Sequence, residues 1–130
     1  MMLEQAIYGY VSTHAGVTAL VGNRIYPLLL PQNPTYPAIV YSRVSRIYEK
    51  DLSGTVWNQS RIQFSCYAKK YSEAKAVAEQ LRSAFRDYRG KIGDIDIMVA
   101  DVTNEIDLYE PDTALFNVSI DVLIKHKGGN

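Results

Sequence analysis

Two segments of this chain alternate apolar and polar residues with the period of a β-strand, and this pattern constrains the fold more than any other feature. In residues 115–125 every second side chain is apolar: Phe116, Val118, Ile120, Val122 and Ile124. Residues 56–68 repeat the pattern through Ile62, Phe64, Cys66 and Ala68. Because successive side chains of a strand point to opposite faces, both segments predict strands with one buried face.

Two further segments have the composition of strands. Residues 38–48 and 95–103 are rich in β-branched and apolar residues. Residues 50–54, KDLSG, separate the first of them from the strand at 56–68 and have the composition of a turn. We therefore predict a hairpin between residues 38 and 68.

Apolar residues at helical spacing predict two amphipathic helices, over residues 2–14 and 73–88. Ser72 is the expected N-cap of the second helix, and residues 16–22 are expected to add one short helical turn. The predicted order is α-β-β-α-β-β. The fold class is α+β, a two-layer sandwich with a mostly antiparallel four-stranded sheet and helices on one face. We expect one domain over residues 1–130, with a frayed tail at 126–130.

Residues 24–41, RIYPLLLPQNPTYPAIVY, hold four of the five prolines and are strongly apolar. Proline lacks a backbone donor and pushes the preceding residue to extended geometry, so residues 26–37 are predicted to be an ordered, extended loop. Two interpretations remain open. Leu28, Leu29 and Leu30 cap the core, or the loop presents Tyr26 and these leucines to a neighbouring subunit.

The formal net charge is zero, which argues against a general nucleic-acid binder. Residues 1–91 carry 12 of the 14 bases and six acids, whereas residues 92–130 carry two bases and eight acids. Either the two parts interleave in one fold and neutralise each other, or the subunit has a positive and a negative flank. Opposite flanks allow head-to-tail association into a ring.

The chain carries no pattern that is typical of catalysis or cofactor binding. His14 and His126 are too few for a general-base or metal site, and a capping or solvent role is expected for both. The single cysteine, Cys66, is expected in the core. The acids between Asp94 and Asp112 do not follow a calcium-loop pattern. We predict no enzyme activity, cofactor or metal. The start of the chain does not match a secretion signal, and no apolar run is long enough to cross a membrane.

The chain contains ten tyrosines, and not all of them fit the predicted core faces. Tyrosine is enriched at protein interfaces. Trp57 alternates onto the polar face of its strand, where an exposed ring would indicate a partner. The alternative is that Trp57 packs under the helix at 73–88.

Several stretches, taken in order, resemble one known family. They are ALVGNRIYPLLLPQ at 19–32, PAIVYSRVS at 37–45, RIQFSCYAKKYSEAKAVAEQLRSAF at 61–85 and DLYEPDTALFNVSIDVLI at 107–124. Together with the first helix they resemble the small tail-completion, or tail-terminator, proteins of long-tailed bacteriophages and prophages. The resemblance covers about residues 3–126.

The resemblance implies an α+β protein that acts without catalysis. Such proteins form a ring, usually hexameric, at the head-proximal end of the tail tube, where they stop tube polymerisation and offer a docking surface for the head. The implied partners are further copies of the chain, the tail tube protein and a head-completion or connector protein, with no specific nucleic acid and no membrane. The implied location is the virion, after assembly in the host bacterial cytoplasm.

Partner contacts are expected at three places. These are Tyr26 in the proline segment, the hairpin with Lys50, Asp51, Leu52 and Trp57, and the acidic loop with Tyr109, Glu110 and Pro111. Two other functions stay open. A head-closure or connector protein forms rings at the same junction, and a small ligand-binding α+β domain would predict a closed pocket and a dimer.

Overall fold

The computed structural model describes residues 2–50, 52–54 and 56–128. These residues form three helices and six strands in the order α-α-β-β-β-α-β-β-β. The helices are α1 (Leu3–Ser12), α2 (Ala15–Val21) and α3 (Tyr71–Phe85). The strands are β1 (Ile25–Pro27), β2 (Ala38–Lys50), β3 (Val56–Ala68), β4 (Tyr88–Ile92), β5 (Ile95–Glu110) and β6 (Leu115–Lys127).

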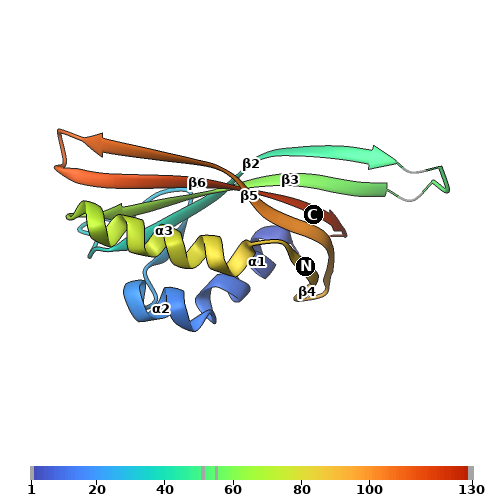
Figure 1. Ribbon diagram of the computed structural model, residues 1–130, viewed down its shortest axis with the longest axis horizontal. Coiled ribbons are helices and arrows are strands. Elements are labelled where there is room, and N and C mark those ends of the chain that lie inside the picture. The colour runs from blue at the N-terminus through green and yellow to red at the C-terminus, as the bar shows by residue number, and fades with distance from the viewer. Residues whose placement is uncertain (1, 51, 55, 129–130) are drawn as a thin grey trace.

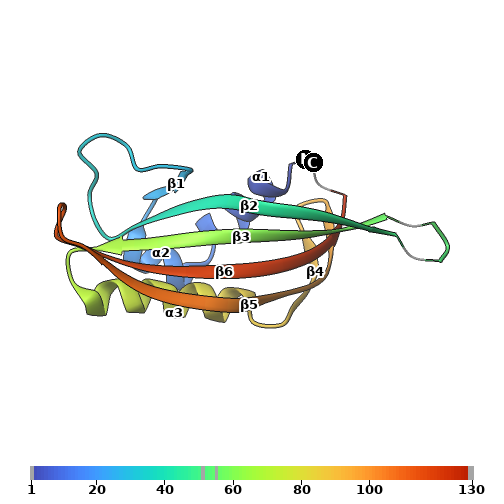
Figure 2. The ribbon, with the colours of Figure 1, turned by 90° about the horizontal axis from the view of Figure 1, so that it is seen from above.

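All six strands form one mixed sheet in the order β1-β2-β3-β6-β5-β4. The short β1 runs parallel to β2, and the other neighbouring pairs are antiparallel. The three helices cover one face of this twisted sheet (Figure 1). The opposite face, seen from above in Figure 2, carries no helix.

The predicted fold class is wrong in its sheet and in its element order. The sheet has six strands rather than four and is mixed, because the proline segment begins with β1 and because α3 ends early. Pro27 is tolerated in β1 because this strand forms an edge of the sheet, where a missing N–H can be accommodated. The helix predicted to reach Tyr88 ends at Phe85, and Asp87, at φ 46°, turns the chain into β4.

The core lies between the helices and the sheet. The apolar stripe predicted on residues 73–88 is buried at each of its helical members: Ala74, Val77, Ala78, Leu81, Ala84 and Phe85. The Phe85 ring lies 5.5 Å from that of Phe64 on β3 and 5.2 Å from that of Tyr10 on α1. The hydroxyl of Tyr10 donates a hydrogen bond to the carbonyl of Ala84 at 2.5 Å. These contacts join α1, α3 and the sheet at one point.

Strand β6 lies in the middle of the sheet, between β3 and β5. It continues to Lys127, and His126 is fully buried, so the expected frayed tail does not begin at His126. Residues 129–130 lie outside the described residues. Cys66 is buried in the core as predicted, and burial raises the pKa of its thiol. A neutral, inaccessible thiol is unreactive.

Candidate functional site

The predicted contacts of the hairpin and of the acidic loop fall at opposite ends of the molecule's long axis, and the third predicted contact, Tyr26, lies on β1. The β2–β3 hairpin projects at one end, and the turn between β5 and β6 forms the other (Figures 1 and 2). Lys50 and Leu52 lie at the hairpin end, and Asp51 lies outside the described residues. Tyr109, Glu110 and Pro111 lie at the β5–β6 turn. The structure therefore does not bring the two groups together within one chain.

The hairpin exposes an unusual amount of apolar surface. Leu52 is fully exposed, and Ile47, Tyr48 and Val56 are exposed as well. The guanidinium of Arg46 lies 4.8 Å from the centroid of the Tyr48 ring and donates to Asn58 Oδ1 at 3.1 Å. An exposed apolar surface on a projecting arm is typical of a protein contact.

Trp57 pairs across the ladder with Glu49 and lies half-buried on the helix-free face. This position follows from the alternation of β3, whose core side chains Ile62 and Phe64 point toward the helices. The alternative in which Trp57 packs under α3 is therefore wrong. Its role in partner binding stays a prediction.

The proline segment exposes its leucines rather than burying them. Leu28 and Leu29 are 76% and 71% exposed, whereas Leu30 and Tyr26 are half-buried. The interpretation in which all three leucines cap the core is therefore wrong. Leu28 also lines an open cleft of about 550 Å³ between α1, β1 and β2, together with Met2, Tyr8 and Tyr41.

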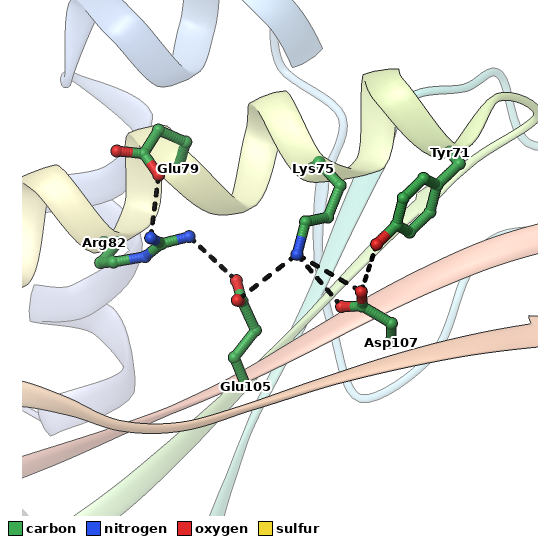
Figure 3. A network of polar contacts seen from close by, with 6 residues as sticks. All are labelled: Tyr71, Lys75, Glu79, Arg82, Glu105 and Asp107. Carbon is green, nitrogen blue, oxygen red and sulfur yellow. Dashed lines mark hydrogen bonds and ion pairs between the residues drawn. The ribbon is translucent and has the colours of Figure 1, made fainter.

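Acidic side chains of β5 pair with basic side chains of α3 within the chain (Figure 3). Lys75 Nζ lies 3.4 Å from Glu105 and 3.3 Å from Asp107, and Arg82 lies 3.1 Å from Glu105. The hydroxyl of Tyr71 donates to Asp107, and this hydrogen bond, followed by those from Lys75, lowers the pKa of the Asp107 carboxyl. The two oppositely charged parts of the sequence thus partly neutralise each other inside one fold.

The acidic turn also contains aromatic packing. The Tyr109 ring, half-exposed, lies 4.9 Å from the Phe116 ring, which lies 5.7 Å from that of Tyr71. Thr113 donates a hydrogen bond to a carboxylate oxygen of Glu110 at 3.2 Å. Among the described residues, no three His, Cys, Asp or Glu side chains gather in a way that could hold a metal ion. No described helix is long and apolar enough to span a bilayer.

Comparison with known proteins identifies the family. A family model described as Tail completion protein gp17 matches residues 5–127. The chain belongs to this family. The resemblance drawn from the sequence is thereby confirmed, although no curated protein matches the chain significantly.

The fold of this tail completion protein also occurs in a solved particle. The chain is similar to one in the structure of the virion of a native gene transfer agent particle, with a TM-score of 0.77 and 16% identity. The match covers 98% of this chain and 96% of the other. At this level of identity the likeness shows a common fold.

One buried polar pair was missed by sequence reasoning, which expected His126 to be a capping or solvent residue. His126 lies on β6 with Nε2 2.8 Å from Ser60 Oγ and Nδ1 2.6 Å from the carbonyl of Gly128. A carbonyl only accepts, so Nδ1 carries the proton and Nε2 accepts from the Ser60 hydroxyl. His126 follows Ile124 by two residues, so extending the alternating pattern by one step places it on the core face. This extension would have predicted the burial of His126 from the sequence.

The stability of this tail completion protein is expected to fall as the pH drops below about 7. Burial, with smaller contributions from Arg46 and Arg43, lowers the pKa of His126 from 6.5, against opposite effects of the Gly128 carbonyl and Glu4. Between pH 6.5 and this lowered pKa, the imidazole of His126 is protonated in the unfolded chain but neutral in the folded chain. The free energy of unfolding therefore falls as the pH falls through this range. The slope is at most about 1.4 kcal/mol per pH unit.

This pH dependence can be measured by urea unfolding between pH 5 and 8, comparing the wild type with His126→Leu. The variant lacks the titrating group, so its stability should change less over this range. Equal slopes of the free energy of unfolding against pH in the two proteins would contradict the assignment of this pH dependence to His126.

Proposed function

We propose that this protein completes the tail of a phage-like particle by forming a ring, hexameric as the resemblance to tail terminators implies, at the head-proximal end of the tail tube. The observation that carries the proposal is the family match over residues 5–127. The shared fold with a chain of a gene transfer agent virion supports it. The chain acts as a single domain in the virion and assembles in the host bacterial cytoplasm.

The proposed mechanism is steric. A ring seated on the last ring of tube subunits occupies the surface to which the next tube subunit would bind, and so ends elongation. Its other side then offers a docking surface to the head-completion or connector protein. The contact residues at opposite ends of the long axis suit this role, because a ring needs one surface for the tube and another for the head.

No catalytic step belongs to this proposal. The described residues offer a buried thiol at Cys66 and a buried imidazole at His126, both enclosed by the core. The contacts proposed for partners are Tyr26, Lys50, Asp51, Leu52, Trp57, Tyr109, Glu110 and Pro111.

The test is tube elongation with the tail tube protein of the same phage or prophage. Preformed tubes are incubated with excess tube subunits, with or without this protein, and their lengths are measured by negative-stain electron microscopy. With this protein we expect elongation to stop and a ring to appear at one end of each tube. A variant that tests the hairpin contact is Leu52→Asp, which removes the exposed leucine and is expected to weaken capping without unfolding the chain.

Two results would overturn the proposal. Binding to purified heads but not to tubes would assign the protein to the connector side of the junction. Unchanged tube growth in excess protein, together with no binding to tubes or heads, would remove it from the junction altogether.

A further inference from the structure

The sheet has two long open edges. Strand β1 pairs only with residues 39–41 of β2, so within the described chain residues 42–50 have a neighbour on the β3 side alone. Strand β4 reaches β5 only as far as Ala100, so residues 101–110 have a neighbouring strand on the β6 side alone, although Lys75 and Arg82 of α3 contact their carboxylates. Unpaired backbone donors and acceptors along an edge strand are a ready template for another strand.

Each edge carries charges and one bulge, which discourage non-specific pairing, but neither edge is blocked by proline. Residues 42–50 and 101–110 contain no proline. Each has one bulge near its start, after Arg43 and after Val102, and is regular beyond it. Both expose apolar side chains, with Ile47 55%, Ile106 44% and Leu108 51% exposed. Beyond the bulges, the backbone donors and acceptors of both edges are available to a complementary strand.

The two edges carry opposite charge. Residues 42–50 contain Arg43, Arg46 and Lys50 against a single acid, Glu49. Residues 101–110 contain Asp101, Glu105, Asp107 and Glu110 and no base. The bases on α3 neutralise only part of this acidic edge. Opposite charges favour pairing of one edge with the other and disfavour pairing of an edge with its own copy.

We propose that copies of this protein join by pairing β2 of one subunit with β5 of the next, so that their sheets continue around a ring. The inference rests on the ring of the proposed function and assigns its subunit interface. Strands β2 and β5 run antiparallel within one chain, because three antiparallel pairings separate them. A copy rotated about the ring axis keeps its strand direction, so its β2 meets the neighbour's β5 antiparallel, and closure pairs residues 42–50 and 101–110 of every subunit.

The alternation of side chains selects the register. Ile47 pairs with Gln59, and Ile106 with Ser119, so both isoleucines lie on the helix-free face. Setting Ile47 opposite Ile106 joins two exposed apolar side chains. The same register sets Arg46 opposite Asp107 on the helix side, which gives an ion pair across the interface.

The offset between the two edges fits a closed barrel. Through Gln59 and Lys125, Ile47 lies level with Val99 of its own chain. From Val99 to Ile106 the chain advances roughly 20 Å, allowing for the bulge, while one subunit repeat across the strands, which is three spacings within the chain and one across the interface, is roughly 19 Å. Each subunit is then displaced along the strand direction, relative to its neighbour, by about the width of one subunit. A displacement equal to the width corresponds to a strand tilt of roughly 45° from the ring axis. Closed barrels have tilts of about 35–45°.

Disulfide trapping tests this interface. The only native cysteine, Cys66, is fully buried, so any cross-link between subunits must come from the introduced cysteines. The variant Ile47→Cys/Ile106→Cys is oxidised after assembly, free or on tail tubes, and separated on a non-reducing denaturing gel. We expect a ladder of cross-linked species up to the ring size. Ile47→Cys and Ile106→Cys alone should stay monomeric on the gel, because a head-to-tail contact does not bring a residue next to its own copy.

The outcomes separate this inference from the proposed function. Rings that form and cap tubes but give no ladder would overturn the edge pairing and leave tail completion intact. Cross-linked dimers from a single variant would show a two-fold contact and overturn it as well. A protein that stays monomeric by light scattering with and without tubes would contradict both.

A charge variant gives an independent readout. Arg46→Glu is expected to raise the protein concentration needed for ring formation at least tenfold at low salt, measured by light scattering. The matched control is Arg61→Glu, which makes the same charge change at an exposed position in the interior of the sheet. Equal effects of the two variants would count against the edge contact.

Discussion

Replacing Phe85 with alanine is expected to lower the free energy of unfolding of the monomer more than any other substitution proposed. The side chain is fully buried and contacts the rings of Phe64 and Tyr10 from the last residue of α3. Removing a buried phenylalanine costs about 3–5 kcal/mol, because its burial is lost and a cavity remains. For a chain of this size we expect the melting temperature to fall by about 10–20 °C.

Thermal unfolding followed by circular dichroism measures this effect, at equal protein concentration because assembly shifts the apparent stability. The control Phe85→Leu keeps most of the apolar volume and should cost less than half as much. A Phe85→Ala variant that melts within a few degrees of the wild type would show that the junction of α1, α3 and the sheet is loosely packed.

The second large effect is expected at the buried pair of Ser60 and His126. Replacing His126 with leucine leaves the Ser60 hydroxyl buried without its partner, at a cost of about 1–3 kcal/mol. Replacing Ser60 with alanine leaves Nε2 of His126 without a donor and should cost a similar amount. The double variant removes both polar groups, so its loss should be smaller than the sum of the two single losses.

Urea unfolding of the four proteins at pH 8, where the imidazole is neutral, completes this double-mutant cycle. A coupling energy of about 1 kcal/mol or more is expected for two groups in direct contact. Additive losses would mean that the Ser60 hydroxyl and the imidazole do not stabilise each other.

The parts of the fold that follow from local periodicity were predictable from the sequence. The strands at 56–68 and 115–125 and the buried stripe of α3 appear where the alternation and the helical spacing placed them. Strands β1 and β4 were not predictable in this way. Each is short, and each exists because a longer strand beside it offers backbone partners, which is a tertiary effect.

The candidate site was predictable only in its composition. The charge difference between residues 1–91 and 92–130 is visible in the sequence, but the pairing of Lys75 and Arg82 with β5 depends on how α3 crosses the sheet. Likewise, the open edges follow from where β1 and β4 stop pairing, which no local pattern in the sequence encodes. Residues such as Ile47 and Ile106 were therefore absent from the predicted contacts.

The central position of β6 has a consequence for how the chain folds during synthesis. Among the described strands, β6 is synthesised after the others, yet it lies between β3 and β5. Until Lys127 has emerged, the β2–β3 hairpin and the β4–β5 pair have no strand between them, and each has an additional unpaired side. The complete sheet is therefore expected to form only after β6 has been translated. A nascent chain stalled before residue 115 should be far more sensitive to protease than a chain stalled after residue 127 has cleared the exit tunnel.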